Sequence, residues 1–448
     1  MNLRTSETDM LHGPLTGKLL TFTLPAALSS MIQQLFNAAD TAVVGCFGNE
    51  SALAAVGTNT EIIALVVTIS SGLSIGANVR IANRIGQGDT GKIPLAVRTS
   101  MLLAGLIGLI LLLGGQWAAA PLLQLIRTPS DIFDGAELYL RLYLLGCPFL
   151  LLYDFGAAAL RARGDSRYPF AALLSAGIAN VGLNLLFVIA FRMDIAGVAI
   201  ATDISGGLSA LAVLRRLTKD PVLHLTFRRP VFSPCIARKV LKIGIPSAVQ
   251  GAVFCLANIF VQASVNTFGE TAIAGSTVAM NFEYFTYYII TAFGQTATTF
   301  TGQNFAAGQY ERCRHILRRC LLLSTVCGSI PIFAIVLFRN FFSGLFTPDA
   351  AVIGSAGVRI VCILLFEPMC SFYEIPAGVL RGSGHALYPA AATMIGICAF
   401  RIVWISTVFR ADPTLPMLYR AFPLSWAAAI LFVNVGFFVI RPLKGTER

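Results

Sequence analysis

The stretch Met31–Gly48, MIQQLFNAADTAVVGCFG, decides the fold class because it places a carboxylate inside an apolar run. The run covers about Leu19–Phe47, which is long enough for a helix to cross a bilayer. Asp40 lies in this run, and Asn37 and Gln33 precede it by one and two helical turns, so the three side chains share one helix face. A carboxylate at membrane depth costs at least about 2.5–3.5 kcal/mol. We therefore interpret Asp40 as functional, with a hydrogen bond between helices as the structural alternative.

The composition predicts an all-α integral membrane protein. The 448 residues are 56% hydrophobic and 12% charged, with a mean hydropathy of +0.74, whereas soluble domains carry about 25% charged residues. The polar start of the chain predicts no cleavable signal peptide. Apolar runs predict twelve transmembrane helices near 18–46, 52–80, 96–120, 134–160, 168–191, 195–215, 238–266, 272–301, 316–340, 352–380, 388–409 and 417–441.

The distribution of positive charge predicts the orientation. With the N-terminus inside, most of the 33 lysines and arginines fall in the inner segments. Because cytoplasmic loops carry an excess of these residues, we expect a multi-pass protein of the plasma (cytoplasmic or inner) membrane with both termini cytoplasmic. This distribution accounts for the net charge of +11 without a nucleic-acid partner.

Two halves of the chain repeat one pattern. IGQGD (Ile85–Asp89) aligns with AGQYE (Ala307–Glu311), and LRARGDSRYP (Leu160–Pro169) aligns with LRGSGHALYP (Leu380–Pro389). Each repeat has six predicted helices, and an even number preserves orientation, so the halves should be related by an axis along the membrane normal.

The repeat predicts two six-helix lobes at 1–219 and 238–448. A polar cytoplasmic linker at 220–237 joins them. Ser70–Ala77, SSGLSIGA, is expected to permit the close approach of another helix. Two lobes with acids between helices are typical of a transporter with alternating access; a channel and a membrane-embedded enzyme are the alternatives.

Polar side chains in the N-terminal half define a candidate ion site with Asp40. Asn180 and Asn184 are four residues apart and share one helix face, and Thr202 lies on the next predicted helix. Their oxygens suit a dehydrated hard cation such as Na⁺, or organise a protonatable acid. Hydrogen bonding between helices is the alternative. For Asp203 we favour a structural interpretation near the outer surface.

Acids in the C-terminal half are candidates for binding a substrate's positive charge. Glu283 and Tyr287 lie in NFEYFTYY, where a carboxylate among aromatic rings suits an organic cation, although an aromatic packing face with the acid paired elsewhere is the alternative. Glu367 and Glu374 are seven residues apart on a similar face. Asp154 and Glu374 occupy matching places in the two repeats, two turns before an arginine, which also suits a structural ion pair.

A combination of motifs resembles one transporter family. FNAADTAVVG (Phe36–Gly45), ALAAVG (Ala52–Gly57), the IGQGD and AGQYER stretches and LRARGDSRYP are together similar to the multidrug and toxic compound extrusion (MATE) family, in its bacterial MepA- and DinF-like branch. The resemblance extends from about Gly13 to Arg441.

The resemblance implies a V-shaped pair of six-helix bundles that exports cationic or amphipathic compounds in exchange for H⁺ or Na⁺. It implies that Asp40 is the coupling residue, accompanied by Asn180, Asn184 and Thr202. NorM-like members carry an acid on the seventh helix, whereas Ile243–Phe268 contains none.

We therefore predict secondary active multidrug efflux by a functional monomer that needs no cofactor beyond the coupling ion. Gln33 and Asn37 join the C-terminal acids as substrate-binding candidates. The main alternative is a flippase for lipid-linked oligosaccharide or peptidoglycan precursors, which would need a basic cavity. A membrane-embedded enzyme is disfavoured because none of the four histidines clusters with a buried acid, and no metal-binding spacing is present.

Overall fold

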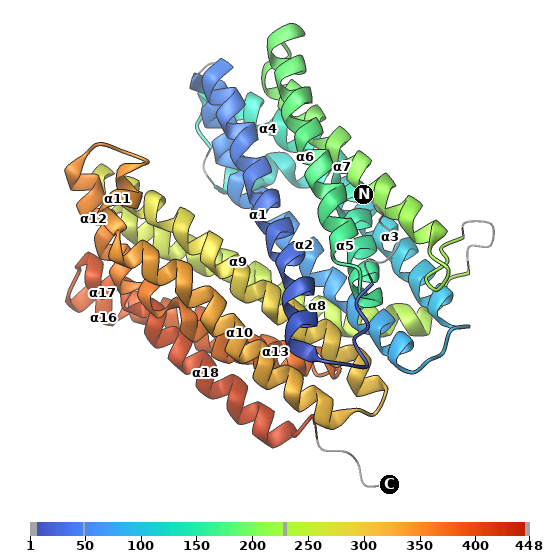
Figure 1. Cartoon of the computed structure of the whole chain (residues 1–448). Helices are drawn as coiled ribbons and strands as arrows, with labels where there is room; N and C mark the ends of the chain where they lie inside the picture. Colours follow the sequence, from blue (N-terminus) through green and yellow to red (C-terminus); the bar gives the residue numbers. More distant parts are fainter. Residues whose placement is uncertain (1–6, 48–49, 127, 227–230, 444–448) are drawn as a thin grey trace. The chain divides into compact units, whose positions relative to one another are not determined.

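The computed structural model describes residues 7–47, 50–126, 128–226 and 231–443, with the backbone alone at 37–39, 41–42, 45–47 and 50–53. This part of the chain is built from helices joined by short connections (Figure 1). The helices are α1 (Leu15–Phe47), α2 (Glu50–Gly86), α3 (Ile93–Leu125), α4 (Ser130–Leu145), α5 (Cys147–Arg163), α6 (Arg167–Leu185), α7 (Asp194–Lys219), α8 (Pro234–Asn266), α9 (Glu270–Ala306), α10 (Tyr310–Leu337), α11 (Arg339–Gly344), α12 (Ala350–Cys362), α13 (Ser371–Gly382), α14 (Leu387–Thr393), α15 (Phe400–Ser406), α16 (Val408–Ala411), α17 (Leu415–Tyr419) and α18 (Ala421–Ile440).

Within this described part, ten helical segments are long and apolar enough to cross a membrane, and eleven when the bent pair of α4 and α5 counts as one span. The sequence predicts twelve. The run expected at 272–301 forms α9, which has 37 residues but is less apolar because it carries Glu283, Asn281 and several threonines. The prediction of an all-α, multi-pass membrane protein is confirmed.

The helices group into two compact units. Unit 1 contains Leu28–Ala248 with Glu7 and Thr8, and unit 2 contains Asp9–Ala27 and the chain from Val249 onward. The first part of α1 thus belongs to unit 2, and the first part of α8 belongs to unit 1. The contacts between residues place the division inside these two long helices, whereas the sequence places it at the linker 220–237. The linker boundary stays a prediction.

Glycines allow close helix packing inside unit 1. A Cβ on Gly76 would lie 2.1 Å from the carbonyl oxygen of Val240 on α8, and one on Gly72 would lie 2.5 Å from Cα of Ala248. Small residues let helix backbones approach when there is no water to drive association. The expectation that Ser70–Ala77 permits close approach is therefore confirmed by the contact of α2 with the first part of α8.

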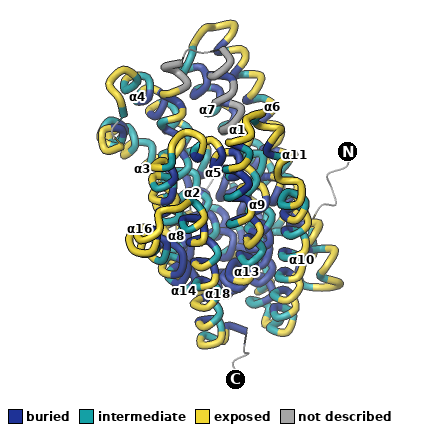
Figure 2. The backbone as a smooth tube through the Cα atoms, turned by 90° about the vertical axis from the view of Figure 1, so that its left-hand side faces the viewer, coloured by how far each residue is buried: buried dark blue, intermediate teal, exposed yellow. Residues whose placement is uncertain are grey.

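Apolar side chains also cover outer surfaces of the helices. On α3, Leu106, Ile110, Leu113 and Trp117 follow one another at helical spacing and are 53%, 58%, 62% and 82% exposed. Figure 2 shows further exposed residues along peripheral helices such as α10. A contiguous exposed apolar face of this kind is suited to lipid contact.

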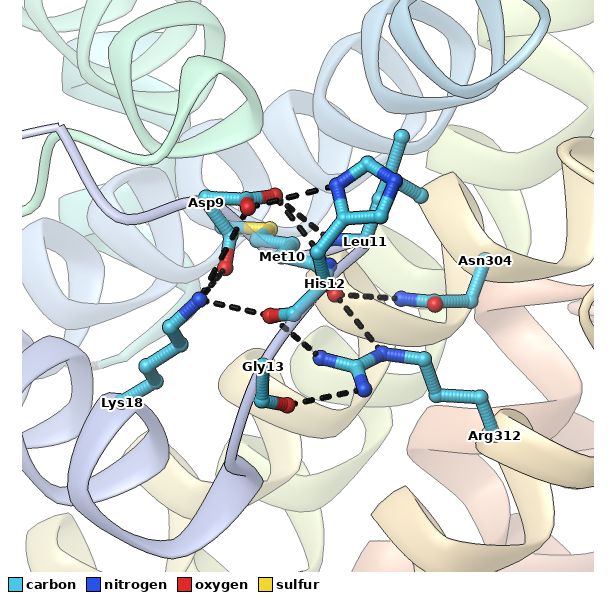
Figure 3. A network of polar contacts seen from close by, with 8 residues as sticks. All are labelled: Asp9, Met10, Leu11, His12, Gly13, Lys18, Asn304 and Arg312. Carbon is cyan, nitrogen blue, oxygen red and sulfur yellow. Dashed lines mark hydrogen bonds and ion pairs between the residues drawn. The ribbon is translucent and has the colours of Figure 1, made fainter.

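The segment Asp9–Gly13 attaches the start of α1 to unit 2 (Figure 3). Met10 is 1% exposed, and its carbonyl oxygen accepts hydrogen bonds from the side chains of Asn304 (3.1 Å) and Arg312 (3.2 Å). Arg312 also donates to the carbonyl oxygens of His12 and Gly13, both at 3.0 Å. We call Asp9–Gly13 the N-terminal strap.

Candidate functional site

The predicted ion-site residues of unit 1 meet in one buried cluster. Asp40 is 3% exposed; one carboxylate oxygen accepts a hydrogen bond from Nδ2 of Asn184 at 2.7 Å, and the other accepts from the hydroxyl of Thr202 at 2.8 Å. Nδ2 of Asn180 lies 3.2 Å from Oγ1 of Thr202, and Oδ1 of Asn180 accepts from Asn184, also at 3.2 Å. The geometry thus brings together Asp40, Asn180, Asn184 and Thr202.

Local sequence explains how the helices bring these groups together. Asn180 and Asn184 are one turn apart on α6, which packs against α7, the helix that carries Thr202. A Cβ on Gly177 would lie 1.7 Å from the ring of Phe36, so only glycine at this place lets α1 approach α6. Asp40 follows Phe36 by one turn. A π-helical stretch, Leu186–Ala190, continues α6 beyond the cluster, and such stretches are frequent at functional sites.

One oxygen of the cluster has no hydrogen-bond donor. Oδ1 of Asn184 is buried, and none of the described groups bonds to it. The ion pairs between described residues include none with Asp40. A buried carboxylate without a cationic partner and an amide oxygen without a donor can both be satisfied by a proton on the carboxyl or by a small cation.

A cavity of about 90 Å³ adjoins the cluster within unit 1. Asn180 and Thr202 belong to its wall, as do Gln33 and Phe36 of α1. Asp40 is not among the lining residues, but its hydrogen-bond partner Thr202 is. Gln33, predicted as a substrate-binding residue, therefore reaches a cavity, whereas the side chain of its predicted neighbour Asn37 falls outside the described part of the structure.

Asp203 lines the same cavity, although the sequence favoured a structural role for it. Its carboxylate lies against Gly146, between α4 and α5. A Cβ at position 146 would lie 2.1 Å from Oδ1 of Asp203, so the glycine is required. The usable signal in the sequence was the adjacency of Asp203 to Thr202 on α7.

Glu283 of unit 2 forms an ion pair. Arg359 of α12 donates from Nε and Nη2 to the two carboxylate oxygens at 2.7 and 2.8 Å, and from Nη1 to Ser276 at 2.6 Å. Its guanidinium also lies 5.3 Å from the centre of the Tyr419 ring. This geometry matches the alternative in which the acid is paired elsewhere, and a substrate-binding role for Glu283 stays a prediction.

The remaining C-terminal candidates lie inside unit 2. Glu374 pairs with Arg381 at 2.6 Å along the same helix, α13, rather than with a neighbouring helix. Its repeat counterpart Asp154 accepts from Ser70 at 2.6 Å. Glu367 is 3% exposed and accepts from Thr286. Tyr287 packs against the core cluster of unit 2 that contains Tyr373. A substrate-binding role for Glu367, Glu374 or Tyr287 stays a prediction.

Comparison with known proteins places this architecture in a family. The family profile described as MatE matches residues 25–186 and 246–405, which cover the two predicted repeats. "Probable multidrug resistance protein YoeA" of Bacillus subtilis is 23% identical over 92% of this chain and 91% of its own length. "Multidrug export protein MepA" of Staphylococcus aureus is 19% identical over 94% of each. The solved structure of a MOP superfamily transporter from Pyrococcus furiosus superimposes with a TM-score of 0.91 over 99% of both chains at 21% identity.

The helical units and the buried polar cluster define a multi-pass membrane transporter. The chain belongs to the MatE family of multidrug and toxic compound extrusion transporters. The predicted resemblance and two-lobe fold class are confirmed, and the homologues are named as multidrug resistance and export proteins.

Proposed function

We propose that this chain is a secondary active exporter that moves organic cations and amphipathic compounds out of the cell in exchange for H⁺ or Na⁺. The observation that carries the proposal is the Asp40 cluster: a carboxylate at membrane depth, held by neutral side chains and lacking an ion-pair partner among the described residues. A carboxylate at membrane depth carries a large free-energy cost, so its presence indicates a functional role.

The cluster suits either coupling ion. A desolvated carboxyl favours its neutral form, so Asp40 can hold a proton. The amide of Asn184 can then turn over, so that its oxygen, which now lacks a donor, accepts from the protonated carboxyl. For Na⁺, oxygens of Asp40, Asn180, Asn184 and Thr202 are ligands of the hard type that such ions prefer.

Ion movement supplies the energy for export in this proposal. Occupation of Asp40 by the ion favours one arrangement of the helices and release of the ion favours another, so that a gradient drives the cycle. One charge crossing 100 mV is worth about 2.3 kcal/mol. We place the protein in the plasma membrane as a monomer with cytoplasmic termini, as its charge distribution predicts.

The chemistry of the cavity disfavours the flippase alternative. Transport of a pyrophosphate-linked lipid needs a basic cavity, and the lining residues include neither lysine nor arginine. Arg401 is the main buried basic group left over. It is 3% exposed in unit 2, where it donates to Ser425 and Asn258 and lies 3.9 Å from the centre of the Phe422 ring.

Transport of a fluorescent cation into everted membrane vesicles tests the proposal. Proton and sodium gradients are imposed separately, and vesicles without the protein are the control. We expect one of the two gradients to drive uptake of the dye. If neither gradient moves any of several cations, the exporter assignment is wrong.

A further inference from the structure

The cavity of unit 1 is lined by a single charged side chain, that of Asp203. The other lining groups are amides, hydroxyls, a thiol, aromatic rings and aliphatic side chains. A negative charge in such a wall is an attractive position for a cation, because the surrounding apolar groups weaken competition from water.

The carboxyl group of Asp203 has no cationic partner among the described side chains. It lies against Gly146, and the ion pairs between described residues do not include it. The structure puts this acid half-buried in a cavity wall, whereas the sequence favoured a structural role near the outer surface. Since no ion pair with a described residue occupies it, this carboxyl group can accept hydrogen bonds from a ligand.

Asp40 is in a different situation. Both of its oxygens accept hydrogen bonds from protein groups, and it is not among the residues that line the cavity. A cation in the cavity thus meets Asp203 directly, whereas the carboxylate of Asp40 is already engaged by Asn184 and Thr202.

Aromatic rings complete the features suited to a cation. Phe36, Tyr143 and Tyr153 line the same cavity, and a flat positive group attracts the faces of such rings. Tyr143 also interacts electrostatically with both Asp40 and Asp203, which places the two acids in one neighbourhood.

We infer that Asp203 binds the positive group of the transported compound while Asp40 is reserved for the coupling ion. The inference rests on the proposed function and adds two points to it. The substrate binds in the cavity of unit 1, and it is a flat aromatic monocation whose binding requires no acidic group of unit 2. Thr202 and Asp203 are consecutive on α7, so displacement of the backbone at Asp203 by a substrate shifts the hydroxyl that hydrogen bonds to Asp40. This adjacency links the two sites.

Equilibrium binding of a matched pair of probes to the purified full-length protein tests the inference. N-methylphenanthridinium is permanently charged, and phenanthridine is its uncharged analogue at pH 7.5. We expect Asp203→Asn to weaken binding of the charged probe by about tenfold or more, because a direct charge pair is lost. Binding of the uncharged probe should change by less than about twofold, because asparagine keeps the size of aspartate and one carbonyl acceptor.

Two variants serve as controls. Asp134→Asn removes an exposed acid from α4 in the same unit and should bind both probes as the wild type does. Asp40→Asn should retain binding of the charged probe within about threefold while losing gradient-driven transport.

Several outcomes would overturn the inference: unchanged binding of the charged probe to Asp203→Asn, an equal loss for both probes, a tenfold loss in Asp40→Asn alone, or no binding of the charged probe to the wild type. Failure of the proposed function has a different signature. In that case the wild type binds the charged probe through Asp203, but no imposed ion gradient moves it across the membrane.

Discussion

Asp40 and Glu283 show that acids buried in apolar surroundings differ by their partners. Asp40 is surrounded by neutral amide and hydroxyl groups, so its charge state is free to change during a transport cycle. Glu283 is paired with Arg359, whose Nε and Nη2 donate to its two carboxylate oxygens. Burial alone therefore marks neither residue as functional.

Replacement of Thr202 by valine should impair ion coupling without unfolding the protein. The change keeps the side-chain shape and removes the hydroxyl that donates to Asp40, and a hydrogen bond to a charged group is worth about 1.5–3 kcal/mol. We expect the ion concentration for half-maximal transport to shift by about tenfold. Thr218→Val, on the same helix, is the control; equal shifts in both variants would contradict the role of Thr202.

Loss of Arg359 should destabilise the protein strongly. Arg359→Met leaves the carboxylate of Glu283 buried and unpaired, which should lower the free energy of unfolding by about 3–5 kcal/mol. Chemical unfolding in detergent measures this free energy. Glu283→Gln in the same chain should restore much of the loss, because no bare charge remains. If the single variant unfolds as the wild type does, or if transport of cations falls with unchanged stability, Glu283 is a substrate site after all.

The sequence predicts the ion cluster residue by residue because helical spacing alone places the side chains on faces. Asn180 and Asn184 share a face wherever α6 packs, and the cost of burying Asp40 is local. The sequence contains no comparable signal for which side chains on different helices will contact each other. The pairing of Glu283 with Arg359, 76 residues away, depends on how α9 packs against α12, and the position of Asp203 depends on the break at Gly146.

At the scale of elements, α1 connects the two units. Its first part packs within unit 2, where Thr23 and Thr296 are hydrogen bonded at 2.8 Å, and its second part carries Asp40 in unit 1. The first part of α8 contacts α2 through glycines. The sequence predicts these long helices but not their division between units, since the division is a property of long-range contacts.

Gly76→Ala should destabilise unit 1. The added methyl group would lie 2.1 Å from the carbonyl oxygen of Val240, a backbone atom that cannot move away by side-chain rotation. We expect a loss of about 1–3 kcal/mol, measured by thermal unfolding in detergent. Gly105→Ala on α3 is the matched control, since no atom lies within 4 Å of its added Cβ. Equal stability of the two variants would contradict the close packing of α2 and α8.

Arg312→Ala should release the N-terminal strap. The change removes donors to the carbonyl oxygens of Met10, His12 and Gly13, and hydrogen–deuterium exchange of the strap amides should accelerate by about tenfold or more. Arg318→Ala, an exposed arginine of the same helix, should leave the exchange unchanged. Unaltered exchange in Arg312→Ala would mean that Met10 alone holds the strap.

Acid should weaken the strap only well below neutral pH. Burial by itself would raise the pKa of Asp9, but the N–H groups of Leu11 and His12 and the charge of Lys18 outweigh it and hold the pKa below its usual value. A lowered pKa contributes stability above the unfolded value of about 3.9 and loses it as the pH falls further. The exchange rate of the strap should therefore not depend on this group between about pH 5 and 8.

At the scale of the whole molecule, three features indicate a membrane transporter. They are the charge asymmetry, the duplication and the polar cluster. The repeat is visible in the sequence and again in the two matched segments of the family profile. The proposed ion site belongs to one repeat only, because Val261 stands at the place equivalent to Asp40. Because the fold is duplicated but the acid is present in one repeat only, we favour a single coupling position in unit 1.

Transport by reconstituted Asp40→Asn protein tests the central claim most directly. The wild type and the variant are placed in liposomes at equal density, a proton or sodium gradient is imposed, and movement of a fluorescent cation is followed. We predict gradient-driven transport by the wild type and a loss of about tenfold or more in the variant, which should still fold and insert. Gradient-driven transport by Asp40→Asn at the wild-type rate would contradict the assignment of Asp40 as the coupling residue.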